Sequence, residues 1–337
     1  MKRKPSPRVS SVRATVAHLV GPGSVNVKGT RLAFAPLEGT SLRLDPKALQ
    51  GLFCYGSIHM SQPALSVCLQ EGVEIAWLTR NGARCRGRTS PVDPKGLSLR
   101  LLQHRALADP SRKLEIAREI VIEKIDSQAR STRHMSRHGR SSPKLVSRVA
   151  GTLRQAKQGA LKANHPDTLR GHEGTASAAW FTIFADLLPS AFPFDRRSTR
   201  PPHNAVNAAL SLGYTWLLRR AEARLAAAGF EAGLGALHDL RPGRPSLACD
   251  FIEPFRVPAV DRWVLRCLAR GTLVASDFRK VPGGVHLAPG SFGKALTSWE
   301  QHAAAIDLSR SFDDLSKRLE SWVRHRPGQE KEQPREG

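Results

Sequence analysis

The first hundred residues alternate hydrophobic and polar positions over short distances, which is typical of β-strands. Apolar or alternating runs fall at four places, 30–35, 41–44, 52–53 and 73–78. Glycines such as Gly39 and Gly72 separate these runs. Asn81-Gly82, between IAWLTR and ARCRGR, predicts a two-residue hairpin turn. One short helix is expected over 61–71. This part of the chain therefore predicts a small, mostly β domain.

From residue 102 onward the hydrophobic positions change to the spacing of helices. Asp109-Pro110 predicts a helix start, with a capping carboxylate and a proline at the first helical position. The apolar residues that follow, Leu114, Ala117, Val121 and Ile125, recur every three or four positions. A second strong helical pattern covers 205–228 and ends at Gly229, a residue suited to a helix C-terminus.

These patterns predict an α+β protein with an N-terminal mostly-β domain followed by a larger all-α domain. A chain of 337 residues is long for one core, which agrees with two domains. We expect a basic N-terminal extension over 1–24, the β-rich domain over 25–102, the helical domain over 103–325 and a disordered tail over 326–337. The tail sequence, RPGQEKEQPREG, is polar and contains proline and glycine.

The charge of the chain indicates a polyanionic partner. Lysines and arginines number 52 against 29 aspartates and glutamates, which gives a net charge of +23. Nucleic acid is the commonest polyanion for such a protein, and a generally basic or membrane-surface protein is the alternative. No run of 18 apolar residues occurs, so no membrane span is expected. The five cysteines are widely spaced, which favours reduced thiols in a cytoplasm over disulfides or a zinc site.

The basic residues are concentrated in one stretch. Residues 127–170 contain ten lysines and arginines and a single acid. Four of the arginines, Arg130, Arg133, Arg137 and Arg140, are spaced three, four and three apart, so they share one face if the helix continues this far. Arg148 extends the patch. We expect these side chains to contact backbone phosphates of DNA, with a solvated helix face as the alternative.

A candidate metal site lies in the segment LHDLRPGRPSLACDFIEPFRVPAVDR. His238, Asp250 and Glu253 are residue types that bind a divalent cation. Arginines of the same segment are suited to hold a phosphate, and we assign Arg241, Arg244 and Arg256 to that task. Metal and phosphate together indicate phosphodiester chemistry. Asp250 and Glu253 are three residues apart, but Pro254 disfavours a helical Glu253, so we expect a kink or a helix junction.

Each of these residues also has a simpler interpretation. A lone histidine such as His238 is often a satisfied core residue. Asp250 is explained equally by an ion pair with Arg244 or Arg262, and Asp261 by a surface position beside an arginine. Glu173, in LRGHEGTASAAWF, precedes an apolar helical pattern. An acid in the first turn of a helix is explained by the helix dipole alone.

The same motifs resemble a known family, the CRISPR-associated integrases that insert new spacers into CRISPR arrays. The resemblance rests on Glu173-Gly174, on RPPHNAVNAALSLGYTWL, and on the segment from Leu237 to Arg262. The N-terminal part, GLFCYGSIHMSQPALSVCLQEGVEIAWLTRNG, is similar to the β domain of that family. One departure is Asn204-Ala205, where the family commonly has Asp-Pro. Because asparagine is also a good N-cap, we expect the helix to form.

The resemblance implies a site and partners that the residues alone do not establish. It places Mg²⁺ or Mn²⁺ on Glu173, His238 and Glu253, with Asp250 as a further catalytic carboxylate in the helical, catalytic domain. It also implies a prokaryotic cytoplasmic protein that forms a homodimer through the β domain. The implied partners are a small companion CRISPR adaptation protein and double-stranded DNA, both as spacer precursor and as CRISPR repeat.

Together these observations predict a metal-dependent DNA endonuclease and integrase that joins a DNA 3′-hydroxyl to a phosphodiester of the repeat. Two alternatives stay open at the level of sequence. One is a non-catalytic DNA-binding scaffold on the same fold. The other is a transposon-type integrase that acts outside a CRISPR locus.

Overall fold

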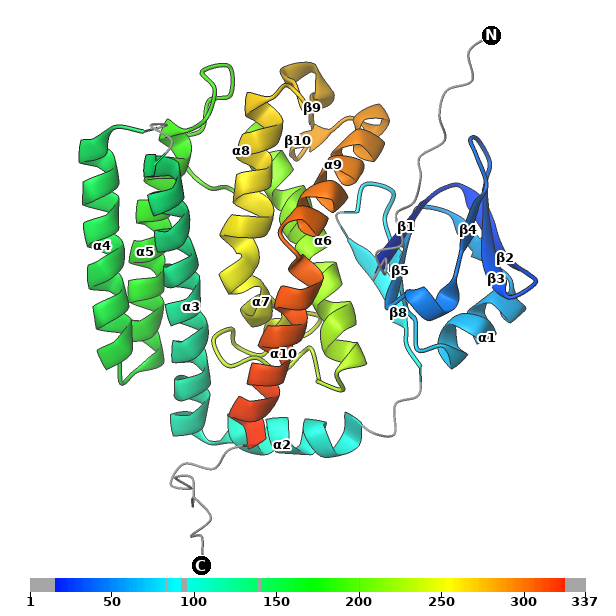
Figure 1. Cartoon of the computed structure of the whole chain (residues 1–337), viewed down its shortest axis with the longest axis horizontal. Helices are drawn as coiled ribbons and strands as arrows, with labels where there is room; N and C mark the ends of the chain where they lie inside the picture. Colours follow the sequence, from blue (N-terminus) through cyan, green and yellow to red (C-terminus); the bar gives the residue numbers. More distant parts are fainter. Residues whose placement is uncertain (1–15, 83, 92–95, 138–140, 200, 325–337) are drawn as a thin grey trace, which may run out of the picture. The chain divides into compact units, whose positions relative to one another are not determined.

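The computed structural model describes residues 16–82, 84–91, 96–137, 141–199 and 201–324. The chain divides into two compact units, residues 1–92 and 93–337. Strands dominate the first unit and helices dominate the second (Figure 1). The predicted α+β class, with the strand-rich part first, is therefore confirmed.

Within its described residues, the strand-rich unit contains two four-stranded sheets and one α-helix. The first sheet has the order β1 (Val16–Val20), β5 (Gly51–Tyr55), β7 (Glu74–Leu78) and β8 (Cys85–Thr89). The second has the order β4 (Leu42–Leu44), β3 (Arg31–Pro36), β2 (Gly23–Lys28) and β6 (Ile58–Met60). The helix α1 (Gln62–Gln70) follows β6, and the short turn η1 (Pro46–Ala48) precedes β5. β1, β5 and β7 run parallel, and β8 returns antiparallel to β7.

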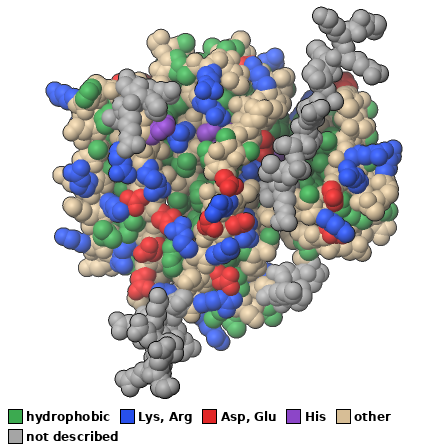
Figure 2. Space-filling model, viewed as in Figure 1, with side chains coloured by type: hydrophobic (Ala, Val, Ile, Leu, Met, Phe, Trp, Pro, Cys, Tyr) green, Lys and Arg blue, Asp and Glu red, His purple; other side chains and the backbone are tan. Residues whose placement is uncertain are grey.

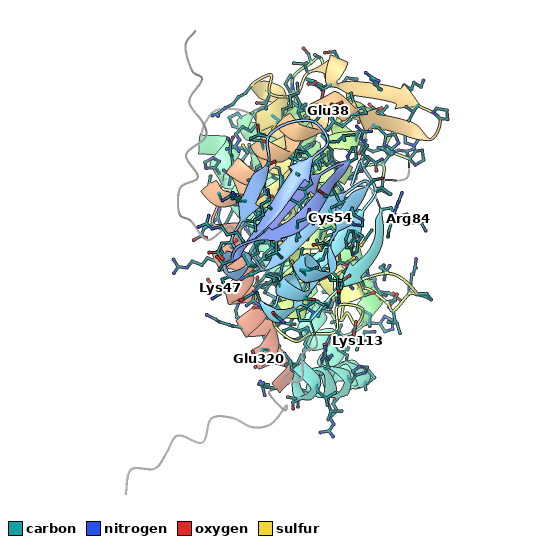
Figure 3. All side chains as sticks on the ribbon, turned by 90° about the vertical axis from the view of Figure 1, so that its right-hand side faces the viewer. Glu38, Lys47, Cys54, Arg84, Lys113 and Glu320 are labelled. Carbon is teal, nitrogen blue, oxygen red and sulfur yellow. The ribbon has the colours of Figure 1, made fainter. Side chains whose placement is uncertain are left out.

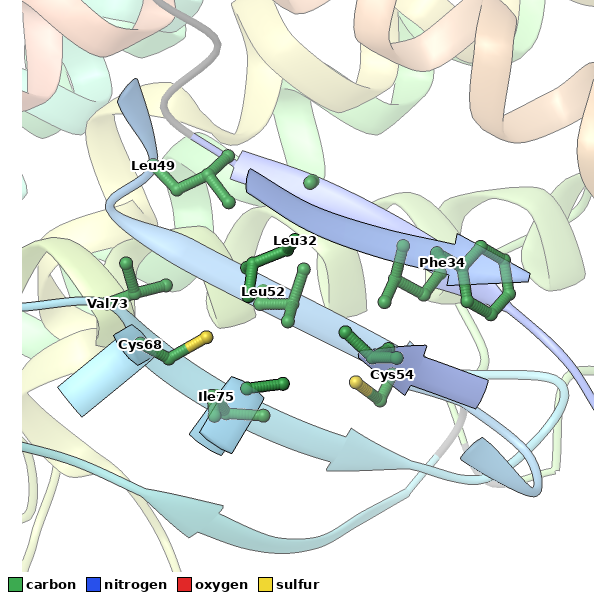
Figure 4. Packing of buried hydrophobic residues seen from close by; sticks show 12 residues of the cluster. Leu32, Phe34, Leu49, Leu52, Cys54, Cys68, Val73 and Ile75 are labelled. Carbon is green, nitrogen blue, oxygen red and sulfur yellow. The ribbon is translucent and has the colours of Figure 1, made fainter. Parts of the chain in front are cut away.

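The core of this unit lies around β5. All five residues of β5 are buried, which explains why this strand reads as a continuous run, GLFCY, without alternation. Leu52 and Cys54 of β5 pack in one cluster with Leu32 and Phe34 of β3 (Figure 4). Cys68 of α1 belongs to the same cluster. The two sheets and the helix thus enclose one apolar core.

The structure corrects two details of the strand-rich part. The strand β1 and the start of β2 lie inside the predicted N-terminal extension over 1–24, so that boundary is wrong. The hairpin at Asn81-Gly82 is present, but it is longer than two residues. The Thr79 amide donates to the Arg84 carbonyl at 2.9 Å, and Gly82 has a φ of 69°. Residues 1–15 lie outside the described part of the chain.

The helical unit begins earlier than residue 103. Its long helices are α2 (Gly96–Ala108), α3 (Pro110–Arg137), α4 (Pro143–Lys162), α5 (Pro166–Asp186), α6 (Ala205–Ala227), α9 (Phe292–Ala305) and α10 (Leu308–Arg324). Between α6 and α9 lie the shorter elements α7 (Ser246–Ile252), η2 (Glu253–Phe255), η3 (Arg256–Asp261), α8 (Arg262–Ala269), η4 (Ala275–Asp277), β9 (Phe278–Val281), β10 (Gly284–Leu287) and η5 (Pro289–Ser291). The antiparallel pair β9 and β10 contradicts the expectation that this part is all-α. The predicted tail, 326–337, lies outside the described residues.

Helices α3, α4 and α5 lie side by side (Figure 1). The helix α4 is capped by Ser142, whose hydroxyl accepts from the Leu145 amide at 3.3 Å. The ring of His172, from α5, packs against Gly159 of α4. A Cβ at this position would lie 2.2 Å from the ring of His172, the neighbour of Glu173. The glycine thus leaves room for the His172 ring at the level of the candidate site.

Three further local predictions are confirmed, and one is wrong. The Asp109 carboxylate accepts from the Ser111 amide at 2.9 Å at the start of α3. The Asn204 side chain caps α6 by accepting from the Asn207 amide at 2.8 Å, and Gly229 follows the helix with a φ of 86°. However, α5 begins at Pro166, so Glu173 is not in a first turn and the dipole explanation does not apply to it.

The cysteines agree with their predicted state. All five are free thiols in the structure. Cys54 is buried among the strands of the first unit, whereas Lys47 and Arg84 are exposed at its surface (Figure 3). Among the described residues, no helix combines the length and the apolar character needed to cross a membrane.

Candidate functional site

Glu253 lies at the junction between an α-helix and a 3₁₀ turn. The α-helix α7 ends at Ile252, a 3₁₀ turn covers Glu253–Phe255, and a π-helical turn covers Arg256–Asp261 before α8 begins. Proline has no N–H to donate, so Pro254 interrupts the α-helical bonding. The predicted helix junction is confirmed. The expected loss of helical backbone at Glu253 is wrong, because its φ of −55° and ψ of −44° are helical.

The centre of the site is a lysine that sequence analysis did not identify. The Lys124 ammonium, from α3, lies 2.5 Å from Glu253 Oε2 and also bonds Glu173 Oε1 from α5. Lys124 is 5% exposed and Glu253 is 4% exposed. Ser177, one turn along α5, donates to the same Glu173 oxygen at 3.0 Å. Two of the predicted metal ligands therefore meet at a single cation.

His238 is held beside this centre by Asp250. The histidine lies in the loop between α6 and α7 and is partly exposed, so it is not a core residue. Its Nδ1 lies 2.5 Å from Asp250 Oδ1. The completely buried Asp250 also accepts from the backbone amides of Ala236, Leu237 and His238 at 2.6, 3.0 and 3.0 Å. The carboxylate of Asp250 thus fixes both the loop and the imidazole.

Two more residues shape this loop. The buried Gln103, from α2, bonds the backbone of Glu231 and Leu234 at 2.9 to 3.0 Å. Gly235 leaves room for Asp250, because a Cβ there would lie 2.7 Å from Asp250 Oδ2. The expected ion pairs of Asp250 with arginines are wrong, since its partners are His238 and three backbone amides.

The pKa values of the site follow from burial and from neighbouring charges. Burial raises the pKa of the Glu253 carboxyl, but the charges of Arg256 and Lys124 outweigh burial and lower this pKa to about 2. Burial lowers the pKa of His238, while the hydrogen bond and charge of Asp250 and the charge of Glu253 raise it above its ordinary value. Glu253 is therefore ionised at neutral pH and requires positive charge around it.

Arg256 joins the carboxylate site to a second buried network. Its guanidinium donates to Glu253 Oε1 at 3.0 Å and lies 4.4 Å from the ring centroid of Tyr214. The Tyr214 hydroxyl bonds Asp261, and the Trp180 indole donates to the same carboxylate at 2.7 Å. Asp261 is 1% exposed, so its expected place at the surface is wrong.

The side chains fit a divalent cation only after a rearrangement. In the part of the chain that the structure describes, no group of three or more histidine, cysteine or acidic side chains stands ready to hold a metal ion. Two observations nevertheless favour such an ion. The buried Glu253 Oε2 is compensated by a cation, the Lys124 ammonium at 2.5 Å. Glu173 and Glu253 already converge on one cation, and their oxygens are the donors that Mg²⁺ and Mn²⁺ accept.

The predicted DNA-binding arginines fall into two sets. Arg130 and Arg133 on α3 and Arg148 on α4 are exposed, and none of the three forms an ion pair with the residues that the structure describes. Since α3 continues to Arg137, that arginine is on the same helix. The side chain of Arg137 and the whole of Arg140 lie outside the described residues.

The other set is engaged within the protein. Arg244 bonds the Asp239 carbonyl and the Ser246 hydroxyl, and Arg256 bonds Glu253. Arg241 is exposed on the loop. On the face shown in Figure 2, basic and acidic side chains alternate over the helical unit, so this face is not uniformly basic.

One feature of the sequence marks Lys124, namely its place on the apolar stripe of α3. Ala117, Val121 and Ile125 form the buried stripe of α3, and Lys124 and Gln128 lie on the same stripe. A lysine on a buried stripe needs a charged partner. The pattern indicates that a carboxylate faces Lys124, but it does not indicate which one.

Comparisons with known proteins agree on one family. Residues 17–301 match the family model described as CRISPR associated protein Cas1. The CRISPR-associated endonuclease Cas1 3 of Thermus thermophilus is 34% identical over 253 residues, which cover 75% of this chain and 73% of that protein. The fold is similar to a CAS1 protein from Thermotoga maritima, with a TM-score of 0.79 and 20% identity over 94% of this chain and 99% of the other. It is also similar to part of a Cas6-RT-Cas1--Cas2 complex, with a TM-score of 0.77 and 21% identity over 95% of this chain and 36% of that chain.

Proposed function

This chain belongs to the CRISPR-associated protein Cas1 family, and we propose that it is an endonuclease and integrase that inserts spacer DNA into a CRISPR array. The observation that supports this most directly is the meeting of Glu173 and Glu253 at one cation, beside a histidine whose ring is fixed by a buried aspartate. The cation seen there is the Lys124 ammonium, and phosphodiester chemistry needs a divalent metal ion in its place, held by carboxylates and an imidazole of this kind.

In this proposal Glu173, His238 and Glu253 hold Mg²⁺ or Mn²⁺. The ion supplies positive charge to the phosphodiester oxygens. Asp250 has a positioning role, because it binds Nδ1 of His238 and leaves Nε2 as the nitrogen for the metal. Arg256 keeps Glu253 ionised and oriented from the other side. The 3′-hydroxyl of the incoming DNA attacks a phosphodiester of the repeat and forms a new P–O bond. The P–O bond to the neighbouring repeat nucleotide breaks, and its 3′-oxygen leaves as a hydroxyl after taking up the proton that the attacking hydroxyl loses. Attack by water in place of the 3′-hydroxyl gives endonuclease activity.

The DNA contacts are proposed on the exposed arginines. Arg130, Arg133 and Arg148 have no acidic partner within the described residues, so DNA phosphates would supply the missing negative charge. Arg137 and Arg140 would continue this contact along the chain. Arg241 is free to reach a phosphate near the site, whereas Arg244 and Arg256 would first have to share or exchange their present partners. Each phosphate contact removed should lower the log–log salt slope of binding by about 0.9.

The proposed assembly is a homodimer formed through the strand-rich unit. A structure similar to this fold is part of a Cas6-RT-Cas1--Cas2 complex. We extend this to the present chain and propose that a small companion adaptation protein of the Cas2 kind binds it, together with double-stranded DNA.

A joining assay tests the proposal. The purified chain is incubated with a short duplex that has free 3′-hydroxyls and with supercoiled plasmid, in Mn²⁺, Mg²⁺ or EDTA. Glu253→Gln and His238→Ala are the test variants. Asp239→Ala is the matched control, because this exposed acid lies in the same loop as His238 and pairs with Arg170.

We expect metal-dependent joining or nicking of the plasmid by the wild type and by Asp239→Ala, and none by the two test variants. Intact plasmid in every lane, with unchanged duplex binding and with the companion protein supplied, would support the non-catalytic scaffold instead. The assay would give the same result if the protein were a transposon-type integrase. The genes next to its own gene would distinguish the two classes.

A further inference from the structure

Lys124 occupies the place that the proposed metal ion needs. Its ammonium contacts Glu173 Oε1 and lies 2.5 Å from Glu253 Oε2. The three side chains come from α3, α5 and η2, so tertiary packing brings them together. The lysine is 5% exposed. A metal ion on the same two oxygens and the ammonium in its present position exclude each other, because both are cations and both need the same atoms.

We propose that Lys124 is a tethered cation that holds the metal position between Glu173 and Glu253 in the metal-free protein and has to leave it when a divalent cation binds. This inference rests on the proposed function. Lysine suits such a role, because its ammonium is a compact charge on a flexible four-carbon stem. Without it, Arg256 alone would compensate Glu253 in the metal-free state, and Glu173 would keep only its hydrogen bond from Ser177.

Arg256 makes the exchange feasible. It holds the opposite oxygen of Glu253, Oε1, at 3.0 Å. When Lys124 leaves, Glu253 therefore keeps one positive neighbour and its orientation. Glu173 keeps the hydrogen bond from Ser177 at 3.0 Å. Both ligands are thus anchored independently of the lysine, and only the cation between them is exchanged.

The proposal predicts the sign of one substitution. If Lys124 competes with the metal, its removal tightens metal binding, because no ammonium has to be displaced. If Lys124 only orients the two carboxylates, its removal weakens metal binding. The two roles therefore give opposite results in one measurement.

The measurement is a Mn²⁺ titration of the full chain followed by electron paramagnetic resonance, which reports free Mn²⁺ without any DNA or turnover. Lys124→Gln keeps hydrogen-bonding capacity and removes the charge. Lys157→Gln is the matched control, since this lysine pairs with Asp126 at 2.7 Å and has no contact with Glu173 or Glu253. Glu253→Gln tests the metal site itself.

We expect Lys124→Gln to lower the Kd for Mn²⁺ on the order of tenfold, since a like charge is removed from a poorly solvated site. Lys157→Gln should leave the Kd unchanged, and Glu253→Gln should abolish binding. An unchanged or higher Kd in Lys124→Gln would overturn the inference while leaving the proposed function intact. Equal Mn²⁺ binding by Glu253→Gln and wild type would overturn both.

Crystals of the Mn²⁺-bound wild type provide a second test that needs no variant to fold. The Lys124 ammonium should be out of ion-pair distance from Glu253. An ammonium that stays against both carboxylates with Mn²⁺ bound would refute the exchange.

Discussion

Asp250 should act mainly by holding the loop that presents His238, and removing it should destabilise the helical unit. In Asp250→Ala three backbone amides, those of Ala236, Leu237 and His238, lose their acceptor. A buried donor left without a partner costs roughly 1–3 kcal/mol, so three donors suggest a loss of about 3–6 kcal/mol after partial relaxation. This is a large share of the roughly 5–15 kcal/mol that stabilises a typical domain.

Equilibrium urea unfolding followed by tryptophan fluorescence measures this loss. Five of the six tryptophans belong to the helical unit, so the signal reports chiefly on that unit. Asp250→Asn should lie between wild type and Asp250→Ala, because its amide keeps one acceptor oxygen. Asp239→Ala is the control. Its side chain is 59% exposed and forms a surface ion pair, for which a loss of about 0–1 kcal/mol is expected.

A loss in Asp250→Ala that matches the control would refute this account. The loop would then be stable without the carboxylate, and any effect of Asp250 on activity would have to come from direct contact with the metal or the DNA.

Three further predictions concern groups outside the metal site. Burial lowers the pKa of His302 from 6.5 to about 4, against a hydrogen bond to the Pro258 carbonyl. As the pH falls, this histidine therefore takes up a proton in the unfolded chain before it does so in the folded protein. The free energy of unfolding, measured in urea between pH 7 and pH 4, should fall by up to roughly 3 kcal/mol because of this group. His302→Gln should remove this part of the pH dependence. Tyr214→Phe should cost about 1–3 kcal/mol in urea unfolding, and less in an Asp261→Asn background, because it removes a donor from a buried carboxylate. Maleimide should label Cys85 first in the native protein, and Cys85→Ser should remove that fast phase. Cys54, Cys68 and Cys267 are buried, and burial raises the pKa of the partly exposed Cys249 to about 11. Equal labelling rates for all five thiols would contradict this.

Much of the secondary structure could be predicted because its causes are local. The caps at Asp109 and Asn204 act on amides within three residues, and the apolar stripe of α3 repeats within the helix. The apolar pattern places the start of α5 too late, because Pro166 and the cap at His165 lie before the first apolar positions of that pattern. The strand β1 is not evident from the local pattern. It forms because it pairs with β5, which lies some thirty residues further along the chain.

The sequence alone predicts the order of the two units, the family resemblance and the chemical types of the site, namely carboxylates, an imidazole and arginines. How these residues meet depends on the packing of the helices. Packing places Lys124 between Glu173 and Glu253. It also pairs Asp250 with His238 and with backbone amides of the loop rather than with an arginine. The physical reason is that a buried charge must find compensation, and which partner lies within reach depends on the packing of helices that are distant in sequence.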